Sequence, residues 1–293
     1  MDDQKSLTSV IMVSFHTGAV LDAAITSVLA QTEPVQLCLV DNGNPPEVVR
    51  KLEDLVAADP RVHLITGHGN VGFSRGCNLG ARAVEGDYLL FLNPDSQLPR
   101  DTIPKLKHYT KIIRQPFMIG ARLLNRDGKD QRGCRRALLT PKTALIEALH
   151  LHRLFPRERL NFHEEPMPIA ILPIPAISGA FMFLSRDDFW KINGFDENYF
   201  LHVEDLDICL RFRRAGGEIY FAPDIVVTHI GGTSNATKAF IEKHKARGFI
   251  RYFQKNFSRQ YPLPLLWVLY VAVWLRTWLK IGLSRLKPAL NIG

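Results

Sequence analysis

Residues able to bind a cation or a phosphate gather at four points in the first third of the chain. Each point follows a short apolar run that predicts a buried strand. The four segments are 14–16 (Ser-Phe-His), 41–43 (Asp-Asn-Gly), 67–72 (Gly-His-Gly-Asn-Val-Gly) and 93–95 (Asn-Pro-Asp). Each alone is an ordinary turn sequence, but four in succession indicate a site. Asp95 is the residue type that binds a hard divalent cation through oxygen while substrate phosphates fill the other positions.

A second group of carboxylates opens a predicted helix. Glu204, Asp205 and Asp207 stand among apolar residues that would bury that helix. Acidic side chains at a helix start also cap its N–H groups and meet its dipole, so any one of them has a structural explanation. Three are more than capping needs. A carboxylate beside a metal-bound diphosphate can act as general base toward an acceptor hydroxyl.

Alternating strands and helices must position these groups. The hydrophobic pattern predicts strands at 9–15, 36–40, 62–65 and 88–92 and helices at 19–31, 47–58 and 74–84. Nearly continuous apolar strands separated by helices are typical of an α/β fold, in which a mostly parallel central sheet has helices on both faces. Ligands are expected at the C-terminal ends of the strands. The sequence lacks the glycine patterns of dinucleotide dehydrogenases and P-loop enzymes, which argues against both classes.

Composition and charge narrow the class further. The 293 residues are 46% hydrophobic and 23% charged, which predicts one large globular domain, with or without an appendage, and excludes disorder. The net charge of +8 is uneven, because residues 238–293 carry eleven basic side chains against one acidic one. The body is therefore nearly neutral, which argues against nucleic acid as a partner. Four widely spaced cysteines and an acidic N-terminus without a signal-peptide pattern predict the reducing cytosol.

The basic tail is predicted to form an amphipathic helix. Residues 166–185 are uncharged but hold four prolines, so we expect a loop and a buried strand there. Residues 265–275 are apolar for only half a membrane span before Arg276. Beyond that point two faces alternate at helical spacing: Arg276, Thr277, Lys280, Ser284 and Lys287 against Trp274, Trp278, Leu279, Ile281 and Leu283.

This pattern, with Trp267 and Tyr270 nearby, predicts a segment of about 263–287 lying in the membrane interface, where aromatic rings settle and basic side chains attract anionic lipid. The alternative is a C-terminal helix packed on the domain with a solvated basic face. We expect a catalytic domain at 1–234 and a basic helical extension at 235–293.

Eight motifs in order carry a family resemblance. They are V-S-F-H, V-D-N-G, N-V-G-F-S-R-G-C-N-L-G, F-L-N-P-D, S-G-A-F-M, G-F-D-E-N-Y-F, E-D-L-D-I-C-L-R and a later His229 before Gly-Gly-Thr-Ser. Over residues 9–234 the chain resembles the inverting family 2 glycosyltransferases with the GT-A fold. Within that family it is most similar to the rhamnosyltransferase-like group.

The resemblance implies roles for individual residues. It places Asp41 on the nucleobase with the backbone around Ser14 and Phe15 beside it. Asp95 and His229 would bind Mg²⁺ or Mn²⁺, while Asn93 replaces the first acid of the metal motif and would bind the sugar or ribose. Further implied donor-binding residues are Asn70, Gly72, Phe73, Arg75, Asn78, Ser178, Gly179 and Arg211. Arg211 has a second interpretation, an ion pair with Asp207.

The resemblance also implies a mechanism. Asp205 would be the catalytic base, Glu204 would bind or orient the acceptor, and the anomeric carbon would be displaced in a single in-line step. We expect a nucleotide-sugar donor, with dTDP-rhamnose as first choice, and a polyprenyl-diphosphate-linked saccharide acceptor reached from the cytoplasmic face of an anionic membrane by a peripheral enzyme of cell-surface polysaccharide synthesis.

Three questions stay open. A UDP-hexose donor would suit the same fold, because Asp41 meets uracil and thymine alike. A catalytically silent nucleotide-sugar-binding scaffold is a different class, which the presence of Asp205, Asp95 and His229 disfavours. In residues 122–165, Arg132, Arg135 and Arg136 could clamp an acceptor diphosphate or form an ordinary solvated surface, and we favour the surface.

Overall fold

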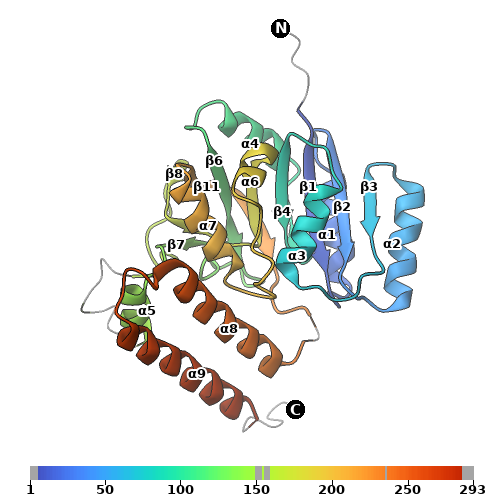
Figure 1. The fold of residues 1–293 in the computed structure, drawn as a ribbon. Helices are drawn as coiled ribbons and strands as arrows, with labels where there is room; N and C mark the ends of the chain where they lie inside the picture. Colours follow the sequence, from blue (N-terminus) through green and yellow to red (C-terminus); the bar gives the residue numbers. More distant parts are fainter. Residues whose placement is uncertain (1–5, 149–153, 155–158, 235, 286–293) are drawn as a thin grey trace.

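A nine-stranded mixed sheet forms the centre of the computed structural model, which describes residues 6–148, 154, 159–234 and 236–285 (Figure 1). The main strand order is β3-β2-β1-β4-β10-β6-β11-β5, and β8 pairs with β11. The strands are β1 (Thr8–Ser14), β2 (Val35–Asp41), β3 (Val62–Ile65), β4 (Tyr88–Leu92), β5 (Ser96–Gln97), β6 (Phe117–Leu124), β8 (Leu172–Pro173), β10 (Phe181–Ser185) and β11 (Glu218–His229).

The first four strands are parallel, as the sequence predicts. Their bounds agree with the predicted ones to within a residue or so, and β3 and β4 match them in full. Every residue of β1 is buried, because helices cover both of its faces. The register pairs Ser14 with Asp41, so the polar residues that end β1 and β2 lie side by side.

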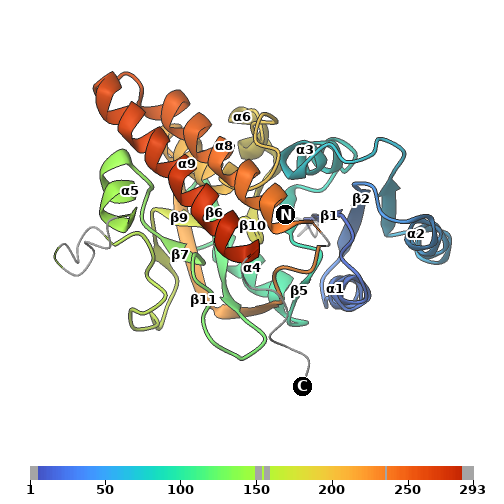
Figure 2. The same ribbon diagram turned by 90° about the horizontal axis from the view of Figure 1, so that it is seen from below.

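Helices pack on both faces of this half of the sheet. Figure 2 shows α1 and α3 on opposite sides of β1 and β2. The helices that follow the strands are α1 (Val20–Leu29), α2 (Pro46–Ala58), α3 (Phe73–Arg82), α4 (Thr102–Thr110), α6 (Arg186–Lys191) and α7 (Glu204–Arg214). The predicted α/β class is therefore confirmed.

The second half of the sheet departs from the parallel pattern. Strand β10 runs antiparallel to both β4 and β6, and β11 is parallel to β6. β10 ends the segment 166–185, for which a loop and a buried strand were predicted, and four of its five residues are buried. A separate two-stranded sheet joins β7 (Arg135–Arg136) to β9 (Ala176–Ile177), and α5 (Pro141–Ala148) follows β7.

Two long helices complete the described chain. α8 (Lys238–Phe257) buries Tyr252, Phe253 and Phe257 in the same hydrophobic core as the sheet. α9 (Leu263–Arg285) runs beside α8 and also contacts α5 (Figure 1). The segment after residue 234 therefore packs closely on the catalytic body. Within the described residues, 263–284 form one helix long and apolar enough to cross a membrane, with a mean hydropathy of 1.4.

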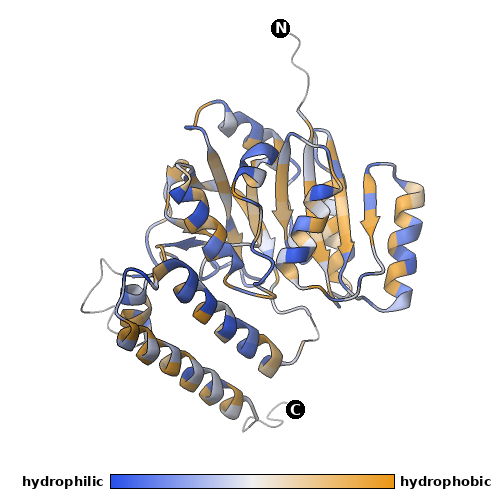
Figure 3. Ribbon diagram, viewed as in Figure 1, coloured by the Kyte–Doolittle hydropathy of each residue, from blue (hydrophilic) through white to orange (hydrophobic). Residues whose placement is uncertain are grey.

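The polar side of α9 faces inward. Thr277 is buried and Lys280 pairs with Glu242 of α8, whereas Trp267 and Trp278 are 66% and 54% exposed. Figure 3 shows the apolar colouring of this helix beside the more polar α8. One predicted assignment is wrong, because Ile281 lies on the buried side, four residues beyond Thr277. Lys287 and the end of the predicted interface segment lie outside the described residues.

Candidate active site

The ends of β1, β2 and β3 meet through the carboxylate of Asp41. Oδ2 accepts a hydrogen bond from the Thr66 hydroxyl at 2.6 Å, and Oδ1 accepts from the backbone and side-chain amides of Asn44, both at 2.8 Å. Asn44 also donates to the carbonyl of Ser14. Burial raises the pKa of Asp41, but these hydrogen bonds outweigh it and leave the pKa below its ordinary value. Phe15 stands half-buried beside this group.

The glycine-rich loop after β3 joins the two polar groups that the sequence separates. The Asn70 side chain accepts hydrogen bonds from Asn42 and from the backbone of Gly72. Gly72 has a φ of +85°, and a Cβ atom there would lie 2.7 Å from the Phe200 carbonyl oxygen. The backbone of Phe73 donates to that same carbonyl at 2.8 Å. The loop therefore packs directly against the segment that leads into Glu204 and Asp205.

Two predicted donor residues on α3 have structural partners. Asn78 is buried, its amide group donates to the carbonyl of Phe195 and to Glu197, and its oxygen accepts from the Phe195 backbone. These hydrogen bonds fix the loop before α7. The structure therefore gives Asn78 a structural role in place of the predicted contact with the donor. Arg75 is exposed and lies 3.8 Å from Glu197, which leaves it able to turn toward a ligand.

Asp95 and His229 lie together at the far end of β4, 134 positions apart in the chain but adjacent in space. Oδ1 of Asp95 is 3.2 Å from Nε2 of His229, and Nδ2 of Asn93 is 3.1 Å from that same nitrogen. Nδ1 of His229 faces Gln131 at 2.6 Å, and the Thr233 hydroxyl donates to Asp95. Burial raises the pKa of Asp95, but the hydrogen bond and charge of His229 outweigh it and leave the pKa below its ordinary value.

This pair fits a divalent cation shared with a ligand. Neighbouring ligands of an octahedral Mg²⁺ ion are about 2.9 Å apart, close to the 3.2 Å between Asp95 and His229. Gln131 holds the outer nitrogen of the imidazole, as partners of metal-binding histidines do. Among the described residues no group of three or more His, Cys, Asp or Glu side chains could hold a metal ion. Asp95 and His229 could therefore supply two ligands to a divalent cation and would leave its other positions to water or a bound ligand.

A strained turn places the two acids at the start of α7. His202 and Val203 both have positive φ, 68° and 74°, and a β-branched residue rarely adopts this conformation. Such strain costs about 1–3 kcal/mol and persists where the surrounding structure enforces it. Here it directs Glu204 and Asp205 from one turn toward different surroundings.

The carboxylate of Asp205 has a charged partner. Its Oδ2 accepts a hydrogen bond from Arg136 of β7 at 2.5 Å and another from the backbone of Gly179 at 3.3 Å. Its Oδ1 accepts from the backbone of Leu206. Burial raises the pKa of Asp205, but the Arg136 charge and hydrogen bond outweigh it and hold the pKa below its ordinary value. Asp205 is therefore ionised at neutral pH, as a base must be.

Glu204 has the opposite environment. It is buried, and its Oε2 has no hydrogen-bond partner among the described residues. Burial, together with the negative charge of Asp205, raises the pKa of Glu204 to about 8. Two neighbouring acids whose pKa values are pushed apart are typical of an active site in which one acts charged and the other neutral.

Residues 178–180 form hydrogen bonds both with Asp205 and with the segment that carries Asp95. A Cβ atom on Gly179 would lie 3.2 Å from Cβ of Asp205, so the absence of a side chain at Gly179 lets Asp205 pack closely against the backbone. Ser178 accepts a hydrogen bond from the Ala180 backbone, and the Ala180 carbonyl accepts one from the Asn93 backbone. One short segment thus links the end of β4, which carries Asp95, to Asp205.

Arg211, which was predicted to contact the donor, is instead bound by groups of the protein. Its Nε donates to Asp207 at 2.7 Å, and its two terminal nitrogens donate to the carbonyls of Ile192 and Gly194. Each of its three guanidinium nitrogens donates a hydrogen bond, and the two from the terminal nitrogens tie α7 to the preceding loop. Of the two interpretations, the Asp207 pair is the one the structure contains.

Our expectation of a solvated arginine surface is also wrong for two of three residues. Arg135 is buried and donates to the carbonyls of Glu165 and Pro166, and Arg136 holds Asp205. Arg132 is exposed and pairs with Glu147 of α5. Sequence reasoning also missed Gln131, the partner of His229, because nothing in the local sequence marks it.

The mixed sheet with its covering helices is a fold of the GT-A type. Residues 9–192 match the sequence profile of glycosyl transferase family 2, and residues 167–234 match that of the N-terminal domain of galactosyltransferase. The chain belongs to glycosyl transferase family 2 and is a glycosyltransferase.

Curated relatives point to the rhamnosyltransferase-like group. The chain is 25% identical to N-acetylglucosaminyl-diphospho-decaprenol L-rhamnosyltransferase of Mycobacterium tuberculosis, over 94% of this chain and 93% of that protein. It is 24% identical to rhamnosyltransferase WbbL of Escherichia coli, over 71% and 87%. The predicted resemblance is confirmed.

Solved structures agree on the fold. GalNAc-T7 with UDP, GalNAc and Mn²⁺ superposes with a TM-score of 0.62 at 17% identity, over 86% of this chain and 48% of that one. The mannosyltransferase PcManGT of Pyrobaculum calidifontis with GDP-Man and Mn²⁺ gives 0.58 at 13% identity, over 97% and 76%.

Proposed function

We propose that this glycosyltransferase moves L-rhamnose from dTDP-rhamnose to a saccharide linked to a polyprenyl diphosphate, with inversion at the anomeric carbon. The observation that carries this choice is the likeness, along nearly the whole of both chains, to a relative named for a decaprenol-linked acceptor and a rhamnosyl product. The profile match to galactosyltransferase favours a second candidate, a UDP-hexose donor.

The chemistry follows from the environments of the two acids. Ionised Asp205 accepts the proton of the acceptor hydroxyl as that oxygen attacks the anomeric carbon. Glu204, protonated at neutral pH, donates a hydrogen bond to the acceptor and holds it. Asp95 and His229 would hold a divalent cation, which when bound neutralises the departing nucleoside diphosphate. Asp41, Ser14 and Asn70 shape the nucleoside end of the site, and Asn93 meets the sugar.

We place the enzyme at the cytoplasmic membrane surface, as a peripheral protein. The support is the row of exposed apolar side chains along α9, together with the basic excess of residues 238–293. Lys280 of α9 pairs with Glu242 of α8 and the two helices pack along their length, which holds α9 against α8 rather than leaving it free to cross the bilayer alone.

Donor identity and the base are tested together. Ligand binding to the folded state raises its melting temperature, so thermal shifts with dTDP-rhamnose and UDP-sugars, each with Mg²⁺ or Mn²⁺, rank the donors without an acceptor. Asp205→Asn should keep the donor-dependent shift and lower transfer by about 10²–10⁴-fold, the usual contribution of a general base. A larger shift with UDP-sugars would favour the second candidate, and normal turnover by the variant would remove Asp205 from its role.

A further inference from the structure

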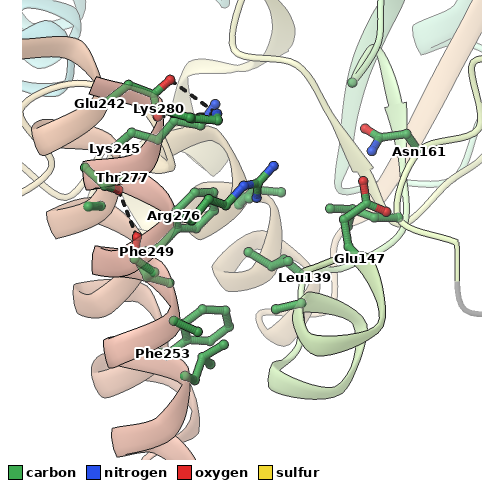
Figure 4. A pocket seen from close by; sticks show the side chains of 18 of the residues that line it. Leu139, Glu147, Asn161, Glu242, Lys245, Phe249, Phe253, Arg276, Thr277 and Lys280 are labelled. Carbon is green, nitrogen blue, oxygen red and sulfur yellow. Dashed lines mark hydrogen bonds and ion pairs between the residues drawn. The ribbon is translucent and has the colours of Figure 1, made fainter. Parts of the chain in front are cut away.

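A cavity of about 360 Å³ lies between α5, α8 and α9, and Arg136 is among the residues that line it (Figure 4). Leu206, the residue after the base, also lines it. Arg136 therefore links the cavity to the proposed active site, because it lines the cavity and donates a hydrogen bond to the carboxylate of Asp205. The cavity is therefore separated from Asp205 by no more than one side chain, that of Arg136.

The cavity wall is strongly cationic. Five basic side chains and two acidic ones line it: Arg132, Arg136, Lys245, Arg276 and Lys280 against Glu147 and Glu242. The two acids are occupied, because Glu147 pairs with Arg132 and Glu242 lies 3.3 Å from Lys280. Lys245 and Arg276 have no ion pair among the described residues. The cavity wall therefore carries an excess of positive charge, which favours an anionic ligand.

The position of Lys245 reinforces that conclusion. Burial lowers the pKa of its ammonium group, and the nearby positive charges of Lys280 and Arg276 lower it further, against smaller opposing effects of Glu242 and Asp205. Like charges held close together without an anionic partner repel one another. Figure 4 shows Arg276 directed from α9 across the cavity toward the α5 side. A bound anion between these side chains would remove their repulsion.

Most of the remaining wall is apolar, and the outward face of α9 is apolar as well. Phe249, Phe253 and Leu269 line the cavity from α8 and α9. The outward side of α9 exposes Trp267, Val271, Leu275 and Trp278. Cationic and apolar walls side by side match a ligand with a phosphate head and a hydrocarbon chain, and they do not match a free sugar phosphate.

We propose that this cavity binds the diphosphate of the lipid-linked acceptor, with Lys245 and Arg276 as its main contacts and Arg136 between the phosphate and Asp205. The proposal rests on the proposed function, because it assumes a lipid diphosphate acceptor. It adds the acceptor subsite to the donor subsite and places the acceptor sugar beside Asp205, while the prenyl chain leaves along the apolar side of α9.

The test is a binding measurement that needs neither donor nor turnover. Farnesyl diphosphate, a short prenyl diphosphate, is titrated into the full chain by calorimetry in detergent, with inorganic pyrophosphate and farnesol as separate arms. The cavity variant combines Lys245→Gln and Arg276→Gln. The matched control combines Lys238→Gln and Arg259→Gln, which removes the same charge from exposed positions on and just after α8 that do not line the cavity.

We expect farnesyl diphosphate to bind the wild type and the control alike and the cavity variant about 10- to 100-fold more weakly, because two charge-assisted contacts are lost. Farnesol binding should not separate the two variants. Equal weakening in both variants, or in neither, would overturn the site. Pyrophosphate binding as tightly as farnesyl diphosphate would overturn the lipid as its occupant.

If the double variant does not fold, the two single variants are compared in the same way. Because no sugar nucleotide is present, a failure of the dTDP-rhamnose proposal leaves this result unaffected. A loss of farnesyl diphosphate binding with normal rhamnose donor binding would in turn concern this cavity alone.

Discussion

Replacing Glu204 by glutamine should stabilise the folded chain, and the gain should grow with pH. Burial and the charge of Asp205 raise the pKa of Glu204 from 4.5 to about 8. Between those pH values the folded chain keeps a proton that the unfolded chain has lost, so the stability of the wild type falls as pH rises through this window and levels off above about pH 8. Because glutamine cannot ionise, the stability of the Glu204→Gln variant does not decrease in this way.

The magnitude follows from the same pKa difference. Each pH unit between the two pKa values lowers the free energy of unfolding of the wild type by about 1.4 kcal/mol. Over the whole window the decrease is about 5 kcal/mol. Between pH 5 and pH 8 the advantage of the variant should grow by about 3–4 kcal/mol. For a chain of this size that is a difference in melting temperature of about 10 °C.

The assay is thermal unfolding of the wild type and Glu204→Gln at pH 5, 6, 7 and 8. Glu53→Gln, an exposed position on α2, controls for the loss of one negative charge. When both proteins also carry Asp205→Asn, the pH-dependent part of their difference in melting temperature should be smaller. The reason is that the negative charge of Asp205 contributes to the raised pKa of Glu204. Transfer at pH 7 should survive Glu204→Gln, since the amide still donates a hydrogen bond. A melting-temperature difference that stays constant with pH would refute the reasoning.

Three further predictions follow from the same structure. Chelator or His229→Ala should remove the metal-dependent part of the donor thermal shift, and an unchanged shift would exclude Asp95 and His229 as the cation site. Arg211→Gln should lower the melting temperature by about 5–10 °C, because a buried pair with Asp207 is broken, without changing donor affinity; a selective loss of donor binding would restore Arg211 to the donor site. Trp267→Glu with Trp278→Glu should weaken co-sedimentation with anionic vesicles at least about tenfold at unchanged melting temperature, and equal binding would argue against α9 as the membrane contact.

Much of the fold is visible in the sequence because its signals are local. The runs that form β1 to β4 are mostly apolar and are followed by polar residues and glycines, so both the strands and the polar edge of the sheet could be predicted. The antiparallel entry of β10 could not, since strand direction depends on the path of residues 125–180 through space.

The charged partners of the site depend on tertiary contacts. Nothing near Arg136 in the sequence indicates that it meets Asp205, 69 positions later, and a run of arginines looks like an exposed surface. Arg211 differs, because it lies four residues after Asp207 on one helix and such spacing favours a pair. For α9 the periodicity indicates which residues share a face, but only packing on α8 decides that the polar face turns inward.

The proposed reaction is the transfer of L-rhamnose to a lipid-linked sugar, with inversion and with Asp205 as the base. The direct measurement is incubation of the full chain with dTDP-rhamnose, Mg²⁺ and a polyprenyl-diphosphate-linked N-acetylglucosamine in vesicles, with the anomeric configuration of the product determined by NMR. We expect a rhamnosylated lipid of inverted configuration from the wild type and almost none from Asp205→Asn. A product that retains the donor configuration, or equal product from both proteins, would contradict it.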